Sequence, residues 1–272
     1  MIARPGLRVG HTSNKDIRMY RHRVQFPIVE SEQLDQDEVY FYLHENGDRH
    51  RFRFHDYGAI YDRPGLYEQI FYDRLKCESP KKVASILRSA VEQAGDSSTT
   101  LRVLDLGAGN GIMGEELRRL GVARLIGADI IREAAEACLR DRGGIYDAYY
   151  VEDFTDLDRS VEEDLRGWTL DCLTAVAALG FGDLPSAAFI NAFNLIKPGG
   201  WVAFNIQQTF LDQRETTSFS RTIRKLVFTD YLEIHHLERY RHRLSIDGEP
   251  IFYYAIAGRK TSDVPRHLLV ED

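Results

Sequence analysis

The segment that most constrains the fold lies at residues 103–111 and reads VLDLGAGNG. An apolar run typical of a buried strand leads straight into three closely spaced glycines, and a helical pattern follows over residues 112–120. Glycine adopts positive φ without strain and lets a ligand approach the main chain, which suits a turn between a parallel strand and a helix. The segment therefore predicts a strand–turn–helix unit that binds a ligand at its turn.

The rest of the chain repeats this strand–helix order and predicts an α/β fold. Apolar strands that alternate with helices favour a doubly wound, mostly parallel sheet with both faces covered. A turn at residues 247–250 joins the last two predicted strands into an antiparallel hairpin, which gives a seven-stranded sheet. The predicted strands are 101–106, 124–129, 148–151, 170–176, 201–206, 232–244 and 251–257, and the predicted helices are 79–94, 112–120, 132–140, 185–196 and about 215–228.

The N-terminal part has a different pattern. Residues 1–30 are polar and basic and predict an extended arm, whereas Asn46-Gly47 joins two alternating runs into a β-hairpin over residues 38–54. Residues 55–76 are rich in aromatic side chains, and we interpret them as a lid over a site in the main domain. An aromatic core that only packs the hairpin on that domain is the alternative. The lid candidates are Tyr57, Tyr61, Tyr67 and Tyr72, and the predicted organisation is 1–78 for arm, hairpin and lid, 79–260 for the α/β domain and 261–272 for a tail.

Length, charge and cysteine content exclude several classes of protein. The 272 residues suffice for one α/β domain with a small appendage. A net charge of −7 repels phosphate backbones, so nucleic acid is an unlikely partner. Three scattered cysteines make neither a disulfide framework nor a metal site, and no stretch has the length and apolarity of a secretory or membrane segment. We therefore expect a cytoplasmic protein that holds no metal and does not bind membranes.

The glycines alone leave the identity of the ligand open. Residues 109–114 also satisfy the Gly-x-Gly-x-x-Gly pattern of dinucleotide enzymes, which use nicotinamide cofactors. The carboxylate of Asp105, however, would oppose the charge of a bound pyrophosphate. S-adenosylmethionine has no phosphate and carries a sulfonium and an ammonium group, which an acid at the strand end favours. Asp105 therefore favours a sulfonium nucleoside, and the sequence shows no hydride-transfer constellation.

Two further strand ends carry acids. Asp129 ends the strand after the glycine turn, where it can accept hydrogen bonds from both ribose hydroxyls; a helix N-cap is the alternative role. Asp153 follows the third strand and can accept from an adenine amino group, although Glu152 and Asp156 compete for that role. Phe154 can cover the adenine ring or belong to the core.

A Pro-Gly-Gly turn at residues 198–200, between a helix and an apolar strand, completes a set of four features. In this order and spacing the set resembles the class I family of S-adenosylmethionine-dependent methyltransferases over about residues 80–260. The resemblance implies S-adenosylmethionine as methyl donor and S-adenosylhomocysteine as product, with the glycine turn on the methionine part, Asp129 on the ribose, and Asp153 with Phe154 on the adenine. The cofactor-binding residues that it implies are Asp105, Gly107, Ala108, Gly109, Gly111, Asp129, Ile130, Asp153, Phe154 and Ala175.

The sequence says less about the methyl acceptor. Residues 177–185 form an apolar loop with Phe181 and lack the Asn-Pro-Pro-Tyr motif of amide and base methylation, which favours a small-molecule acceptor. The catalytic residues stay unknown, with His55, His236, His242 and Tyr61 as candidate bases. A non-catalytic cofactor-binding protein and a methyltransferase acting on protein or RNA are the alternatives, and the oligomeric state stays open, with a homodimer among the options.

Two rows of arginines stand out in an acidic chain. Arg49, Arg51 and Arg53 share one face of the predicted hairpin. In a regular strand over 232–244, His236 and His242 would share one face, and His235, Arg239, Arg241 and Arg243 would share the other. If the two rows converge, they can bind an anionic substrate. The alternative is that each row is a solvent-exposed strand face whose arginines pair with acidic side chains.

Overall fold

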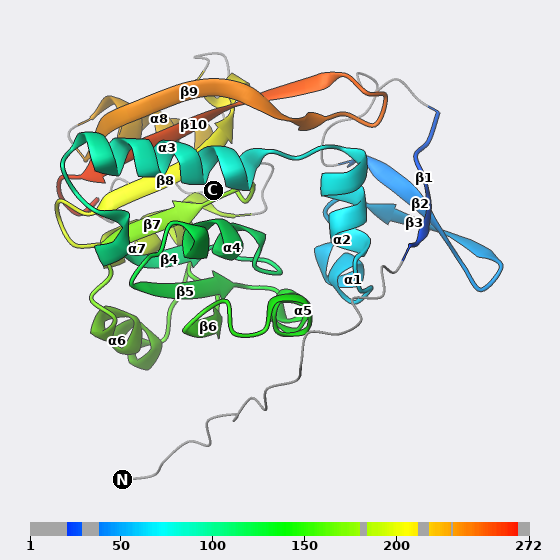
Figure 1. Ribbon diagram of the computed structural model, residues 1–272, viewed down its shortest axis with the longest axis horizontal. Coiled ribbons are helices and arrows are strands. Elements are labelled where there is room, and N and C mark those ends of the chain that lie inside the picture. Colours follow the sequence, from blue (N-terminus) through cyan, green and yellow to red (C-terminus); the bar gives the residue numbers. More distant parts are fainter. Residues whose placement is uncertain (1–20, 29–37, 180–183, 212–217, 230, 266–272) are drawn as a thin grey trace, which may run out of the picture.

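The computed structural model describes residues 21–28, 38–179, 184–211, 218–229 and 231–265, so the predicted arm over residues 1–20, Phe181 and the end of the tail lie outside the described residues. Its main body is a seven-stranded sheet with the order β6-β5-β4-β7-β8-β10-β9 (Figure 1). The strands β6, β5, β4, β7 and β8 run parallel, and β10 is antiparallel to both β8 and β9, which confirms the predicted fold class. The strands are β4 (Arg102–Leu106), β5 (Arg124–Asp129), β6 (Ala148–Val151), β7 (Cys172–Ala175), β8 (Trp201–Gln207), β9 (Leu232–Leu244) and β10 (Pro250–Lys260).

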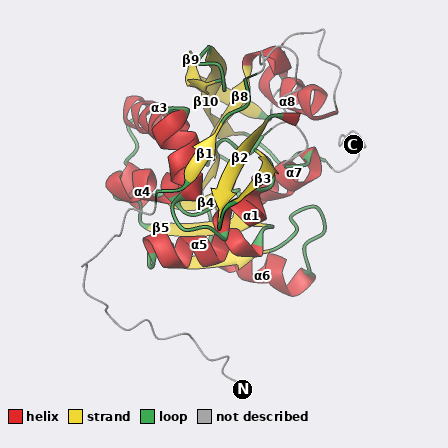
Figure 2. Ribbon diagram, turned by 90° about the vertical axis from the view of Figure 1, so that its right-hand side faces the viewer, coloured by secondary structure: helices red, strands yellow, loops and turns green. Residues whose placement is uncertain are grey.

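Helices cover both faces of this sheet, and Figure 2 shows α3 and α4 on one side with α7 and α8 on the other. The apolar sides of α3 and α4 share one core cluster with Val103 and Leu125 of the sheet. On the opposite face, α6, α7 and α8 share a second cluster with Leu104 and Ile126, as expected where alternate strand residues face opposite sides. The helices of this domain are α3 (Ser79–Gln93), α4 (Ile112–Arg119), α5 (Arg132–Arg142), α6 (Arg159–Gly167), α7 (Ser186–Leu195) and α8 (Ser218–Phe228).

Helix α6 is absent from the sequence-based assignment. It buries Leu165 alone, so its apolar periodicity is too sparse to mark a helix. Exposed ion pairs one turn apart, Arg159 with Glu163 and Arg166 with Glu162, run along its surface instead.

Strand β9 departs from the regular alternation that the sequence predicts. Its register against β10 shifts twice: His236 lies opposite Ala257 but Ile234 opposite Gly258, and Arg241 lies opposite Phe252 but Arg243 opposite Ile251. Each shift inserts one extra residue, which reverses the faces beyond it. Arg243 is therefore buried on the side of His242, and the ring of His235 contacts Trp201. The prediction that His235 and Arg243 share a face with Arg239 and Arg241 is wrong. His236 and His242 do lie on one face of β9, as the sequence predicts.

The N-terminal residues form a separate small sheet, which Figure 2 shows in front of the main one. The predicted hairpin is confirmed: β2 (Tyr40–Glu45) pairs with β3 (Asp48–Arg53), and both turn residues, Asn46 and Gly47, have positive φ. A short strand β1 (Arg23–Gln25) lies along β2, within residues that the sequence assigned to an extended arm.

Residues 55–76, here the tyrosine segment, fold into helical turns that lead from β3 to α3. These are α1 (Tyr57–Tyr61), α2 (Leu66–Glu68) and a π-helical turn (Gln69–Arg74). Their apolar side chains form a core with the hairpin, which includes Phe41, Leu43, Phe54, Ile60, Leu66, Ile70 and Phe71. No helix among the described residues is long and apolar enough to cross a bilayer.

A buried polar network ties the start of α3 to the end strands of the sheet. The Nδ2 of Asn205 donates to the Oη of Tyr240 at 2.9 Å and to the Oγ of Ser79 at 3.2 Å, and Ser79 Oγ lies 2.6 Å from Nδ1 of His242. The Oδ1 of Asn205 accepts from the main-chain N–H of Ala177 at 2.7 Å. Ala177 has a φ of +55°, so this bond holds a strained residue in place.

We predict that Asn205→Leu lowers the free energy of unfolding by about 1–3 kcal/mol, because it leaves the N–H of Ala177 without its acceptor and removes the Asn205 bonds to Tyr240 and Ser79. Urea denaturation of the two proteins at pH 7 measures the difference. Ser98→Ala, at a partly exposed hydroxyl that bonds only Leu120 O, is the control. A cost for Asn205→Leu no larger than that of the control would contradict the prediction.

Candidate active site

A cavity of about 460 Å³ lies between the tyrosine segment and the carboxyl ends of the parallel strands. In a doubly wound sheet, the crevice at these strand ends is where ligands bind. One wall comes from the glycine turn after β4, the ends of β5 and β6 and the loop after β7. The other wall comes from the tyrosine segment. Lining residues include Gly107, Ala108, Gly109, Asn110, Asp129, Ile130, Glu152, Asp153, Phe154, Ala177, Ala178, Leu184 and Pro185.

Neighbouring side chains lie so close to the main chain of the glycine turn that a side chain would not fit at Gly107 or Gly109. Gly109 has a φ of +53°, and a Cβ built on it would lie 2.6 Å from the Oη of Tyr61. A Cβ on Gly107 would lie 2.6 Å from the Cβ of Ala178, in the loop after β7. Contacts this short do not occur between real side chains, so these two glycines let the tyrosine segment and the loop after β7 approach the main chain of the turn.

Asp129 lies in the cavity wall at the end of β5. Its Oδ2 accepts from the N–H of Gly109 at 2.9 Å, and its Oδ1 accepts from the N–H of Ile131 at 3.0 Å. Each carboxylate oxygen keeps a second lone pair for a ligand hydroxyl. Burial raises the pKa of Asp129, and these backbone bonds oppose that rise. Helix α5 begins at Arg132 without a side-chain cap, so the structure does not support the N-cap alternative.

Asp105 does not line the cavity, contrary to what its place at a strand end predicts. It is 1% exposed, and both carboxylate oxygens accept from hydroxyls: Oδ2 from Tyr146 at 2.6 Å and Oδ1 from Thr174 at 2.7 Å. Burial raises its pKa to about 6, and the two hydrogen bonds act in the opposite direction. Asp105 therefore supports the turn from behind.

Two other predicted cofactor residues also lie outside the cavity wall. Gly111 packs beneath the turn, where a Cβ would meet Cys138 at 3.0 Å and Arg142 at 3.3 Å. Ala175 is fully buried in β7, between the neighbouring strands at Leu106 and Phe204. Neither has an atom on the cavity wall; their small size serves the packing of the sheet and turn.

The predicted adenine side is assembled at the ends of β5 and β6. Ile130, Asp153 and Phe154 all line the cavity, as does Glu152, whereas Asp156 does not. The Oδ1 of Asp153 accepts from both the N–H and the hydroxyl of Thr155, which fixes its orientation. Phe154 is 3% exposed and belongs to the core cluster beneath α7, so it serves the core and the wall together.

All four lid candidates line the opposite wall of the cavity. The ring centroids of Tyr61 and Tyr67 lie 4.8 Å apart, and Tyr57 and Tyr72 lie beside this pair. Burial raises the pKa of Tyr61, Tyr67 and Tyr72. These hydroxyls stay protonated near neutral pH, so Tyr61 is unsuited to act as a phenolate base.

Of the candidate histidines, the structure places His55 alone in the cavity wall, with its ring centroid 5.6 Å from that of Tyr57. His242 is buried behind the wall, stacked on Tyr253 at 4.1 Å, and burial together with Arg243 lowers its pKa well below the ordinary value. His236 lies 3.6 Å from Glu238 on the edge strand β9. His236 and His242 are therefore not positioned to act on a ligand in this cavity.

The arginine rows do not converge on the cavity. Arg49 and Arg51 stack on the rings of Tyr42 and Tyr40, on the exposed side of the hairpin. Arg239 stacks on Phe252, and the buried Arg243 donates to the carbonyl of Leu244. The alternative of an arginine site for an anionic substrate is therefore not supported.

The residues behind the turn were not predicted from the sequence. Tyr149 donates its hydroxyl to the carbonyl of Gly109 at 2.8 Å, and Tyr146 with Thr174 holds Asp105. The tyrosine-rich run at 146–150 is the only feature of the sequence that marks these residues. Within the described residues, no cluster of three His, Cys, Asp or Glu side chains has metal-binding geometry.

A family model described as a methyltransferase domain matches residues 76–243, which include every strand and turn of the cavity wall outside the tyrosine segment. The chain belongs to this methyltransferase family. It is therefore an S-adenosylmethionine-dependent methyltransferase with the Rossmann-like fold that the sequence predicted. No curated protein matches the chain in sequence.

Comparison with solved structures finds similar methyltransferases. The N-methyltransferase NodS from Bradyrhizobium japonicum, solved with S-adenosylhomocysteine, has a TM-score of 0.53 and 15% identity, and the match covers 76% of this chain and 97% of NodS. Magnesium protoporphyrin IX methyltransferase from Synechocystis, solved with S-adenosylmethionine, has a TM-score of 0.46 and 16% identity, over 67% of this chain and 79% of that one. At these identities the likeness concerns the fold.

We predict that Asp105→Asn changes how stability depends on pH. Ionisation of Asp105 is disfavoured in the folded state, whose pKa of about 6 exceeds the ordinary 3.8. The wild type therefore loses stability as pH rises from about 4 to about 6, by about 3 kcal/mol from this group. The asparagine does not ionise, so the variant should gain up to that amount relative to wild type between pH 4 and pH 7. Urea denaturation across this range measures it, and a difference that does not change with pH would contradict the assignment.

Proposed function

We propose that S-adenosylmethionine binds in this cavity, with its methionine part on the turn at Gly107–Gly109 and its ribose on Asp129. Asp153 would accept from the adenine amino group, while Ile130 and Phe154 would lie against the adenine ring. The volume of about 460 Å³ is within the usual range for cofactor sites. Among the described lining residues there are three carboxylates, Asp129, Glu152 and Asp153, and no lysine or arginine. This charge pattern fits a cationic nucleoside without phosphate better than a dinucleotide.

We propose that the methyl acceptor is a small molecule that binds against the tyrosine wall of the same cavity. The observation that carries this proposal is the close approach of Tyr61 to Gly109, which brings a covering segment of the chain onto the glycine turn. A cleft enclosed in this way leaves room for a compact acceptor. A phosphate-backbone substrate would need cationic side chains, which the described wall lacks.

Bound S-adenosylmethionine supplies an electrophilic methyl group. The residues of this chain would then act mainly by position, because holding two reactants in line can supply much of the rate of a displacement. The protonated hydroxyls of Tyr61 and Tyr67 can orient the acceptor, and the packed aromatic rings exclude water. For an acceptor that must lose a proton, His55 contributes an imidazole to the tyrosine wall and is the candidate base there.

Calorimetric titration with S-adenosylmethionine, S-adenosylhomocysteine and NAD tests the proposed site. We expect binding of the first two and not of NAD, and we expect Asp129→Ala to weaken S-adenosylhomocysteine binding by about 1–3 kcal/mol because the ribose hydroxyls lose their acceptor. Asp156→Ala is the matched control, since that exposed acid follows the neighbouring strand β6 but does not line the cavity. Binding of NAD alone would overturn the proposal, and an unchanged affinity of Asp129→Ala would show that the ribose lies elsewhere.

A further inference from the structure

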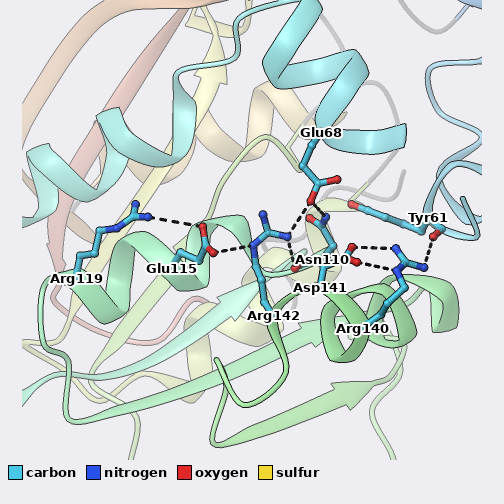
Figure 3. Close-up of polar contacts among 8 residues, drawn as sticks. All are labelled: Tyr61, Glu68, Asn110, Glu115, Arg119, Arg140, Asp141 and Arg142. Atoms are coloured by element: carbon cyan, nitrogen blue, oxygen red, sulfur yellow. Dashed lines mark hydrogen bonds and ion pairs between the residues drawn. The ribbon is translucent and has the colours of Figure 1, made fainter. Parts of the chain in front are cut away.

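The tyrosine segment is fastened to the main domain by a cluster of polar groups beside the glycine turn (Figure 3). The Oε1 of Glu68, on α2, accepts from the Nδ2 of Asn110 at 2.7 Å and from the Nη1 of Arg142 at 2.9 Å. The side chain of Arg142 is 14% exposed and that of Glu68 is 28% exposed, so solvent only partly screens this ion pair.

Asn110 connects this cluster to the cofactor loop. It lies between Gly109 and Gly111, it lines the cavity, and its main-chain carbonyl accepts from Arg142 Nη1 at 3.3 Å while its side chain donates to Glu68. The absence of a side chain at Gly111 leaves room for Arg142 beneath the turn. Asn110 and Arg142 therefore contact both the tyrosine segment, through Glu68, and the backbone of the turn.

A second contact lies two residues before Arg142 on α5. The Nη1 of Arg140 donates to the carbonyl of Tyr61 at 3.1 Å, and Asp141 holds the same guanidinium through two hydrogen bonds (Figure 3). The ring of Tyr61 packs on Ala134 and Ala137 of α5. The segment is thus held at both Glu68 and Tyr61, on either side of the cavity-lining Tyr67.

The cluster around Glu68 is incompletely satisfied. Among the described residues, Glu68 Oε2 and Arg142 Nε are buried and make no hydrogen bond, although Arg142 Nε lies 3.3 Å from Glu115 Oε1. Buried polar atoms without a partner destabilise the arrangement that contains them. Movement of a covering segment often accompanies exchange of cofactor and product. A contact in which some buried polar atoms make no hydrogen bond is easier to break, so it suits a segment that opens repeatedly.

We propose that Glu68, Asn110 and Arg142 form a latch that couples closure of the tyrosine segment to the conformation of the cofactor loop. The inference rests on the proposed binding of S-adenosylmethionine in this cavity. In it Glu68 and Arg142 are positioning residues: they act through Asn110 and through the tyrosines. Release of the latch frees the segment and the loop together, so it controls how long the cofactor stays bound.

Amide hydrogen exchange of the full-length protein without ligand tests the latch itself. We expect Glu68→Ala to speed exchange of residues 57–74 at least tenfold while β4 and β5 exchange as in wild type. Glu68→Gln keeps an oxygen that accepts from Asn110, so it should restore part of the protection. Glu163→Ala, which removes the exposed ion pair with Arg159 on α6, is the control and should change nothing in this segment. Unchanged exchange of 57–74 in Glu68→Ala would overturn the proposal.

The dissociation rate of S-adenosylhomocysteine tests the coupling. We expect Glu68→Ala and Arg142→Ala each to speed dissociation about tenfold, and the double variant to be no faster than either, because both break one unit. Rates that multiply in the double variant would overturn the coupling. If the wild type does not bind S-adenosylhomocysteine, the proposed function fails, whereas the exchange experiment still decides whether the latch exists.

Discussion

The whole site depends on the close approach of three chain segments at Gly109. Its missing side chain leaves room for the hydroxyl of Tyr61, its N–H donates to Asp129 and its carbonyl accepts from Tyr149. The turn is therefore held from the end of β5, from β6 and from the tyrosine segment at once. Any side chain at this position would push the covering segment away from the turn.

Acidic side chains lie in two layers at the turn. In the wall, Asp129 and Asp153 present acceptors to the cavity, and no described lysine or arginine opposes them there. Behind the wall, Asp105 is buried and held by two hydroxyls, at the expense of a raised pKa. A buried carboxylate of this kind destabilises the fold at neutral pH, and its negative charge lies just behind the turn proposed to receive the cationic part of the cofactor.

Much of the fold follows from the sequence because its determinants are local. The alternation of apolar strands with helices, the Asn46-Gly47 turn and the glycines after β4 each specify their own local structure, and the alternation also indicates a mostly parallel sheet. The failures are non-local. The bulges of β9 depend on pairing with β10, and Arg243 changes face as a result. Asp105 lies behind the cavity wall, where its carboxylate accepts hydrogen bonds from Tyr146 and Thr174, two residues distant from it in sequence.

The central claim is that the turn at residues 107–109 and the tyrosine segment enclose one site for S-adenosylmethionine. Ultraviolet cross-linking of the protein with radiolabelled S-adenosylmethionine, followed by peptide mapping, tests it most directly. The account predicts label on peptides that carry the tyrosine segment or the residues at 106–113, 129–131 and 152–155, and loss of that label in excess unlabelled S-adenosylhomocysteine. Label confined to other peptides, such as those of α6 or β9, would contradict it.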